Sequence, residues 1–514
     1  MELELKKVRF DTYEGTSEVT LTQEETEETI VPDYCPDIAR IIDAQGTVFL
    51  HSRELREGKA EVSGTVRVAV LYTPEGESGI RTLEFAIPFS AETDGKSMGE
   101  CCFLSAAAET EFLETRILNP RKVFTRCKLV IRLMGYRRAA LEFCTDTAEQ
   151  TQPLCLEKYQ ELQHGSFLSD ICEKDFTFSD EWDLSPGREG AAEILTSRVT
   201  ASVTEAKTVG SKLVVRGLFR LTLLYKTPSG HYATSSGEEL AFSQIAEIDG
   251  AGEGCVPSVQ LQLTGSDIQI APDSGGDGRK LEVTLYLHMM AFLRQERELT
   301  LLSDLYSTAY DLTYEAQPLT LTERCETLTR RQSVREVLEI GVVADSVLLA
   351  WAGCGAVSVS REGEGVTLRT RAAIRVLYLD EGGAALLAER SVEVSTSLEL
   401  PDNGCISARA CCPEEIQSSL ADHGIEVRFP VEFTVEASTQ KKRVCLSAVK
   451  INTETPKDLS GTPSLVLRSL HKDERVWDLA KAYNTTIDMI LSANGLEAEN
   501  IPKDQLLLIP RKRL

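Results

Sequence analysis

The sequence feature that most constrains the fold is a strand followed by a turn, which occurs three times at a fixed interval. An alternating apolar segment ends in a tyrosine and a turn follows at once, as in RVAVLYTPEG, LTLLYKTPSG and IRVLYLDEGG. The tyrosines are Tyr72, Tyr225 and Tyr378, and 153 residues separate each one from the next. Apolar residues at every second position place one face of a strand in a core. The interval therefore predicts three copies of one β module.

The rest of each copy has the same order of strands and loops. A second alternating strand precedes the tyrosine strand, and an acidic, apolar strand, a loop with cysteine and a long closing strand follow. Short strands joined by turns favour a sandwich or a barrel, and the repeat is too long for a solenoid. We expect a mainly β fold of three antiparallel β-sandwich-like or barrel-like modules, each with its own core, at 1–160, 161–320 and 321–451.

A short segment with helical spacing precedes the core of each copy. The three segments are PDIARIID, GREGAAEIL and SVREVLEI, at 36–43, 187–195 and 333–340. Their apolar residues recur at intervals of three and four, which is the spacing of one face of a helix. We predict short helices, or extended arms, that lead into each sheet.

Composition restricts the kinds of partner. The 514 residues include 80 Asp and Glu but only 55 Lys and Arg, for a formal net charge of −25. Such a surface repels the phosphates of nucleic acids and anionic lipids. No apolar run reaches the ~18 residues of a membrane span, and no secretory signal follows the first methionine. We expect a cytoplasmic protein that binds no nucleic acid and has no transmembrane segment.

Catalytic and metal-binding motifs are missing from the sequence. The fourteen cysteines include no C-x-x-C pair, and most lie in apolar strands, as reduced core residues do. The six histidines are scattered, which argues against zinc. TDGKS at 93–97 resembles the end of a phosphate-binding loop, but Ser90 stands where that loop needs glycine. We expect no enzymatic activity, no cofactor and no metal.

The last fifty residues differ from the repeats. Residues 452–464 contain two prolines and few apolar residues, which predicts a linker. LVLRS then predicts a strand, RVWDLAKAY a helix with an apolar stripe, TTIDMILSAN a second helix, and QLLLIP a closing strand. Gly495 is placed to end the second helix. The segment 465–512 is therefore predicted to be a βααβ domain.

This segment resembles a LysM domain. The matching positions are Val476, Trp477, Leu479, Ala480, Tyr483, Ile487, Ile490, Asn494, Leu507, Ile509 and Pro510. LysM domains bind N-acetylglucosamine glycans in a groove between the first strand–helix loop and the second helix–strand loop. Charged side chains replace the family's glycines in both loops. By this resemblance the groove that holds a partner or a glycan would consist of Asp473, Glu474, Arg475, Trp477, Asn494, Ile501 and Lys503.

The repeats resemble SPOCS domains of spore-forming Firmicutes, through PDIARII, the strand that ends in Leu-Tyr and a turn, and the later apolar strands. Three SPOCS domains and one LysM domain resemble a family of spore coat morphogenesis proteins. The resemblance implies a non-enzymatic scaffold in the mother-cell cytoplasm, at the forespore surface. Its LysM domain would dock on the coat ATPase, a SpoIVA-like protein, to help coat encasement, and other coat proteins could also bind. The alternative is a protein that binds the peptidoglycan of the wall or spore cortex.

Overall fold

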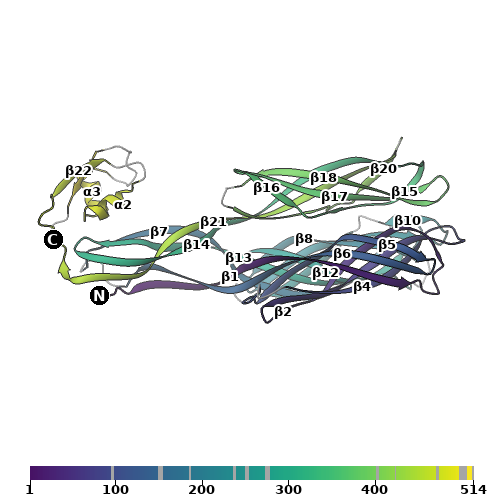
Figure 1. Ribbon diagram of the computed structural model, residues 1–514, viewed down its shortest axis with the longest axis horizontal. Helices are drawn as coiled ribbons and strands as arrows, with labels where there is room; N and C mark the ends of the chain where they lie inside the picture. Colours follow the sequence, from purple (N-terminus) through teal and green to yellow (C-terminus); the bar gives the residue numbers. More distant parts are fainter. Residues whose placement is uncertain are drawn as a thin grey trace.

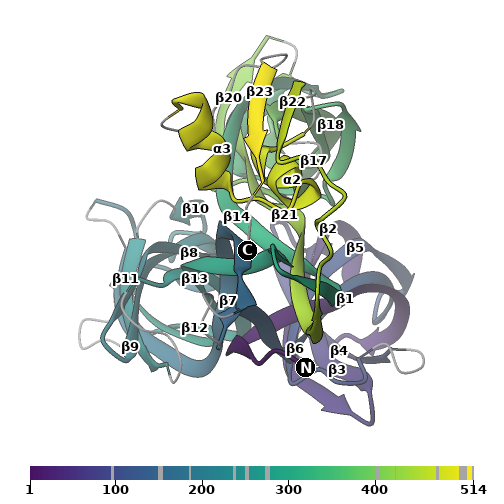
Figure 2. The same ribbon diagram turned by 90° about the vertical axis from the view of Figure 1, so that its left-hand side faces the viewer.

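The protein is an elongated assembly of antiparallel strands with a small mixed domain at one end (Figure 1). Three β modules lie around a common long axis, and a stalk of long strands joins them to the C-terminal domain (Figures 1 and 2). This computed structural model describes residues 1–93, 98–148, 154–184, 187–235, 239–248, 254–272, 278–400, 404–422, 424–469, 474–496 and 506–511.

Each module consists of two facing sheets. In the first, β2 (Ile38–Arg56), β3 (Lys59–Pro74) and β4 (Arg81–Glu92) face β1 (Leu5–Ile30), β6 (Lys122–Thr147) and β5 (Phe103–Asn119). In the second, β8 (Glu193–Val209), β9 (Lys212–Lys226), β10 (Tyr232–Ser235) and β11 (Glu239–Glu247) face β7 (Leu156–Asp183), β13 (Lys280–Ser307) and β12 (Val256–Ile270).

The third module repeats the arrangement with β15 (Ala344–Cys354), β16 (Ser358–Glu362), β17 (Gly365–Asp380) and β18 (Ala385–Glu399) on one side. Opposite them lie β14 (Tyr310–Glu339), β21 (Gly424–Pro456), β19 (Gly404–Cys411) and β20 (Gln417–Ala421). The expected mainly β fold is confirmed, and of the two predicted architectures the modules adopt the sandwich.

The repeated tyrosines occupy one position in all three modules. Tyr72, Tyr225 and Tyr378 lie near the ends of β3, β9 and β17 and are at most 4% exposed. The Tyr72 hydroxyl donates to the carbonyl of Pro36 over 3.2 Å, and that of Tyr225 donates to Glu189 over 3.3 Å. Each acceptor precedes its tyrosine by 36 residues. The tyrosine therefore ties the tyrosine strand to the segment that enters the module.

The stalk is formed where the long strands continue beyond the modules as three hairpin-like ribbons. β1 pairs with β6 as far as Leu5 opposite Thr147, β7 with β13 as far as Leu156 opposite Ser307, and β14 with β21 as far as Tyr310 opposite Pro456. The three ribbons share one apolar core, formed among others by Leu3, Phe143, Leu156, Leu301, Leu305, Leu321, Leu446 and Ile451. All three copies therefore meet in a fourth core that the repeat pattern did not reveal.

Of the two structures predicted for the segments in front of each module, the short helices are wrong, and two of the three segments lie in extended strands. Residues 38–43 begin β2, residues 333–339 end β14, and 188–192 contain no helix. In β2 the register shifts between Ile38 and Arg40 and again between Ile41 and Asp43. A bulge inserts one residue, so apolar side chains three apart reach the same core. In β2, therefore, the bulges produce a spacing of apolar residues like that of a helix.

The segment boundaries also differ from those expected. β21 runs to Pro456 and pairs there with β14, so the connection to the last domain is 457–464 rather than 452–464. Strand β14 already begins at Tyr310, before the expected boundary at residue 320. Long strands that leave the modules account for both differences, because their outer ends pair within the stalk.

Candidate functional site

The C-terminal domain has the predicted βααβ order. It contains β22 (Leu465–Ser469), α2 (Val476–Ala482), α3 (Ile487–Asn494) and β23 (Leu506–Pro510), and β22 pairs with β23. The first helix begins with a capping box in which the Asp478 carboxylate accepts from the Arg475 backbone over 3.0 Å. The hydrogen bond and charge of the Arg475 guanidinium hold the pKa of Asp478 below its ordinary value.

The second helix is fixed at both ends. The Thr486 hydroxyl accepts from the Met489 backbone over 3.2 Å, and Gly495, at φ +63°, ends the helix in the left-handed conformation. The Asn494 amide donates to the carbonyls of Ile490 and Leu508, and its oxygen accepts from the Leu508 backbone over 2.8 Å. The side chain of Asn494 thus joins α3 to β23.

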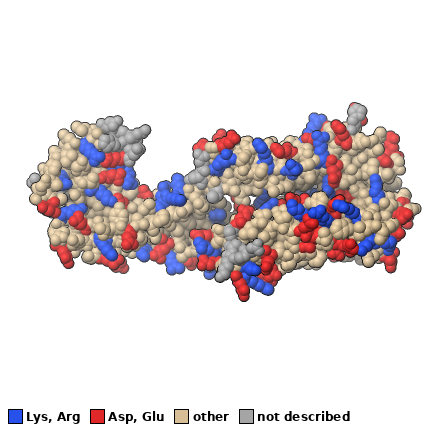
Figure 3. All heavy atoms as spheres, viewed as in Figure 1, with Lys and Arg blue, Asp and Glu red and all other residues tan. Residues whose placement is uncertain are grey.

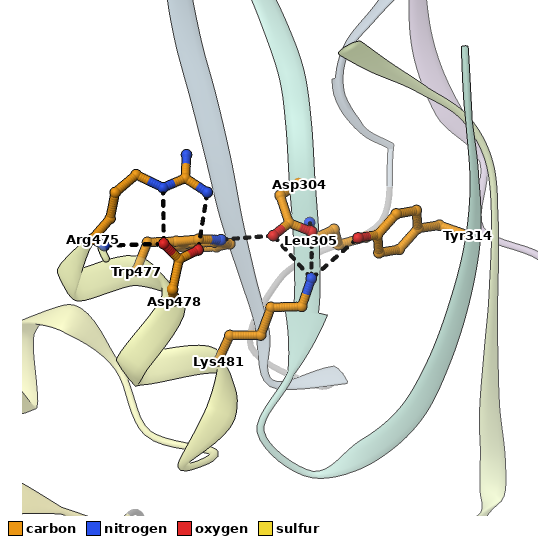
Figure 4. Close-up of polar contacts among 7 residues, drawn as sticks. All are labelled: Asp304, Leu305, Tyr314, Arg475, Trp477, Asp478 and Lys481. Atoms are coloured by element: carbon orange, nitrogen blue, oxygen red, sulfur yellow. Dashed lines mark hydrogen bonds and ion pairs between the residues drawn. The ribbon is translucent and has the colours of Figure 1, made fainter. Parts of the chain in front are cut away.

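The face of α2 packs against the tip of the stalk. Trp477 is 2% exposed and lies between two stalk tyrosines, with ring centroids 5.2 Å from Tyr159 and 4.9 Å from Tyr306. Its indole nitrogen donates to the Asp304 carboxylate over 2.8 Å (Figure 4). Tyr306 also belongs to the apolar cluster of the C-terminal domain. The domain therefore completes its core with residues of β7 and β13.

Lys481 makes the second polar link at the same place. Its ammonium donates to both oxygens of Asp304, at 2.7 and 2.9 Å, and to the Tyr314 hydroxyl at 3.1 Å (Figure 4). Burial alone would raise the pKa of Asp304, but the hydrogen bonds from Lys481, Trp477 and the Leu305 backbone outweigh it and hold this pKa below its ordinary value. At neutral pH Asp304 is consequently ionised, and both of its carboxylate oxygens accept hydrogen bonds from the C-terminal domain.

Further contacts surround this centre. The Tyr306 hydroxyl donates to the carbonyl of Thr485 over 2.7 Å, and burial raises the pKa of this tyrosine. Lys457 donates to the Asn484 side chain over 2.8 Å, and the Arg475 guanidinium lies 4.7 Å from the ring centre of Tyr159. These contacts hold the domain on the stalk in one orientation.

The structure gives structural roles to the predicted groove residues that it describes. Glu474 pairs with Arg468 over 2.9 Å. Arg475 caps α2, Trp477 is buried against the stalk, and Asn494 joins α3 to β23. The predicted positions Asp473, Ile501 and Lys503 lie outside the described residues. The four described residues are thus engaged in caps, ion pairing and packing.

Sequence reasoning missed an exposed apolar face on the opposite side of the domain. Leu467 and Leu506 are 61% and 62% exposed, and Leu465 on the same side of β22 is also exposed. They alternate with Val466, Leu507 and Ile509, which belong to the core cluster of the domain. The sequence does indicate this exposed face. LVLRS and QLLLIP are apolar at consecutive positions, whereas apolar and polar residues alternate in a strand with only one buried face.

Other kinds of site are not supported by the described residues. No three His, Cys, Asp or Glu side chains among them are arranged to hold a metal ion. No described helix is long and apolar enough to cross a membrane. Acidic and basic side chains are interspersed over the face shown in Figure 3, so the net negative charge does not gather in one patch there.

Comparison with known protein families identifies the modules. Residues 37–134 and 191–271 match the family described as "SipL, SPOCS domain". In these two segments the chain is similar to SipL. The first matched segment covers most of the core of the first module, and the second covers one sheet of the second module together with β12. The match relates the chain to sporulation and the spore coat. No curated protein matches the chain.

The third module lies outside the matched residues, although it has the same sandwich. In the matched modules a glycine lies opposite a phenylalanine on the next strand, Gly64 opposite Phe89 and Gly217 opposite Phe242. The third module has Thr370, opposite Val394, at the position of these glycines. The third copy of the SPOCS-like sandwich has thus diverged in its core.

Proposed function

We propose that this SipL-like protein is a non-enzymatic scaffold of spore coat morphogenesis. In the proposal the βααβ domain is a LysM domain that docks on the coat ATPase, a SpoIVA-like protein, at the forespore surface of the mother cell. Docking would help the coat to encase the forespore. The observation that carries the proposal is the leucine face, defined as Leu465, Leu467 and Leu506, which points away from the stalk contact.

An apolar face of this kind favours a protein over a glycan as the bound molecule. Clustered exposed leucines gain most from burial against another apolar surface, at about 25 cal/mol per Å² removed from water. Sugars are usually bound by hydrogen-bonding groups and aromatic rings. Trp477 is the one tryptophan in the last fifty residues of the sequence, and it packs against Tyr159 and Tyr306. It therefore offers no platform for a sugar while the domain stays docked.

The stalk supports the proposal by fixing the direction of the leucine face. The α2 side of the domain is tied to the stalk through Trp477 and Lys481. The β22–β23 sheet consequently presents its outer side to the surroundings. A scaffold needs such a fixed arrangement, because a rigid presentation lowers the entropy lost when the partner binds.

The test is a single substitution in the full-length protein. Leu467→Glu places a charge in the centre of the leucine face and is expected to weaken binding of the purified coat ATPase by at least about tenfold, since burying an unpaired charge is costly. Leu118→Glu, at an exposed leucine of β5 in the first module, is the matched control and should bind normally. Surface plasmon resonance gives both affinities, and circular dichroism checks folding.

Two results would contradict the proposal. If Leu467→Glu binds the ATPase as tightly as the unchanged protein, the leucine face is not the docking site. If the unchanged protein fails to bind the ATPase and is retained on purified peptidoglycan, the glycan-binding alternative replaces the scaffold.

A further inference from the structure

A crevice separates the second module from the third. A cavity of about 70 Å³ lies there between strand β8 on one side and β15 and the segment after β19 on the other. Its lining includes Thr196, Arg198, Trp351 and Cys412. This volume has room for a few water molecules or another molecule of that size, since one water occupies about 30 Å³ of the liquid.

Cys412, which lines this crevice, lies beside a second thiol. Cys354 ends β15 in one sheet of the third module, and Cys412 follows β19 in the facing sheet. Their sulfurs are 3.5 Å apart, and both cysteines are free and only partly buried. We propose that Cys354 and Cys412 are a redox-active thiol pair, which a peroxide converts into a disulfide that joins the two sheets of the third module.

The geometry needs little rearrangement. A disulfide has a sulfur–sulfur distance of about 2.05 Å, so the two sulfurs must approach by about 1.5 Å, which side-chain rotation supplies. Both residues lie next to strand ends, where a side chain can turn without breaking the pairing inside a sheet. The bond would join two cysteines that are 58 positions apart in the sequence.

Arg198 of the second module places a positive charge beside Cys412. The hydrogen bond with Cys354 and burial raise the pKa of Cys412, and the charge of Arg198 opposes this shift. The same hydrogen bond lowers the pKa of Cys354, so the thiolate forms on Cys354, while Cys412, the sulfur that lines the cavity, keeps its proton until it reacts.

The reaction is balanced with one peroxide. The Cys354 thiolate attacks one peroxide oxygen, a sulfur–oxygen bond forms, the oxygen–oxygen bond breaks, and the departing hydroxide takes a proton from solvent. The Cys412 sulfur then attacks the sulfenic sulfur, the sulfur–sulfur bond forms, and the sulfur–oxygen bond breaks. The leaving hydroxide takes the Cys412 proton. Two thiols are thus oxidised, and one hydrogen peroxide is reduced to two waters.

The test uses the reduced full-length protein and a small excess of hydrogen peroxide. Free thiols should fall from fourteen to twelve per chain, and non-reducing peptide mapping should recover the Cys354 and Cys412 peptides joined together. The disulfide should raise the melting temperature by several degrees, and a reductant should reverse the shift. Cys354→Ser and Cys412→Ser should each abolish the joined peptide.

Two comparisons separate this site from general oxidation. Cys144 and Cys445 touch in the stalk but are fully buried, and burial raises the pKa of both thiols, so they should remain reduced. Arg198→Gln should slow formation of the disulfide several-fold without changing the product, and Arg198→Lys should restore most of the rate. The proposal is overturned if peroxide oxidises other cysteines first, or if Cys354 and Cys412 stay reduced. An unchanged rate in Arg198→Gln overturns the role of Arg198.

Discussion

At the residue scale, Asp304 is the side chain on which the stalk and the C-terminal domain converge. One carboxylate accepts from the indole of Trp477 and from the ammonium of Lys481, and the Leu305 backbone also donates to it. Because this mostly buried carboxylate accepts hydrogen bonds from two side chains of the C-terminal domain, it fixes the position and the orientation of that domain on the stalk. The aspartate is the polar partner that lets an aromatic side chain be buried between two domains.

Removing this carboxylate should loosen the domain contact. In Asp304→Ala the Trp477 indole and the Lys481 ammonium lose their acceptor, which costs about 1–3 kcal/mol of docking free energy. Protease cleavage in the 457–464 connection should become faster as a result. Glu315→Ala, at an exposed position of β14 on the same stalk, is the control and should behave as the unchanged protein. Equal cleavage rates for the two variants would show that Asp304 does not hold the domain.

The same residues predict how docking depends on pH. The pKa of Asp304 is lowered by docking, so its contribution is present above the ordinary aspartate value of about 3.9 and is lost as the pH falls through the docked value. The pKa of Lys481 is raised: burial opposes the shift, and hydrogen bonds from Lys481 to Asp304 and Tyr314 outweigh it. Its contribution is present below the ordinary lysine value of about 10.4 and is lost as the pH rises through the docked value.

Small-angle X-ray scattering across the pH range measures this dependence. The domain should stay docked between about pH 5 and pH 9 and should separate from the stalk at either extreme. Asp304→Asn should be less tightly docked at pH 7 and should show a weaker change on acidification. A particle shape that is identical at about pH 2 and at pH 7 for the unchanged protein would contradict the assignment.

At the element scale, one glycine in each matched SPOCS module lets two strands and an aromatic ring approach closely. A Cβ on Gly217 would overlap the carbonyl oxygen of Ser202 and the ring of Phe242. Gly64 has the same surroundings in the first module. The third module has Thr370 at this position, opposite Val394, and the Thr370 hydroxyl donates to the carbonyl of Gly355. In the first two modules the glycine is thus required by a backbone carbonyl of the neighbouring strand together with the phenylalanine ring.

Substitution of this glycine should destabilise the second module. Gly217→Ala forces the ring and the neighbouring strand to move, and we expect a loss of about 1–3 kcal/mol in the free energy of unfolding. Gly353→Ala is the matched control, because this strand glycine has open space around its Cα, and its effect should stay within about 0.5 kcal/mol. Urea unfolding gives both values. Equal stability of the two variants would disprove the packing argument.

The elements also show what could be read from the sequence. Period-two strands, turns and the tyrosine interval predicted the three sandwiches, because alternation and turn residues are local properties. For the segments before each core the sequence left short helices and extended arms both open, since the bulges in β2 depend on pairing with β3 and are invisible in one strand alone. In the last domain the helix stripes were predictable, whereas the burial of Trp477 depended on Tyr159 and Tyr306, more than 150 residues away.

At the scale of the whole molecule, the three copies are not independent domains joined by linkers. Their long strands meet in one stalk core, and β1 and β7 join the first two modules into a six-stranded sheet. The stalk therefore holds the C-terminal domain at its tip in a fixed position relative to the three modules (Figure 1). Three modules, a shared stalk and a fixed outward leucine face together form a rigid support for a docking surface.

Hydrogen–deuterium exchange of the full-length protein, with and without the purified coat ATPase, tests this account most directly. Binding should slow exchange in β22 and β23, which carry the leucine face. It should leave α2 unchanged, because the stalk already protects Val476–Ala482. Protection confined to the three modules, or faster exchange in α2 as the domain leaves the stalk, would contradict the claim that a docked domain presents its leucine face to the partner.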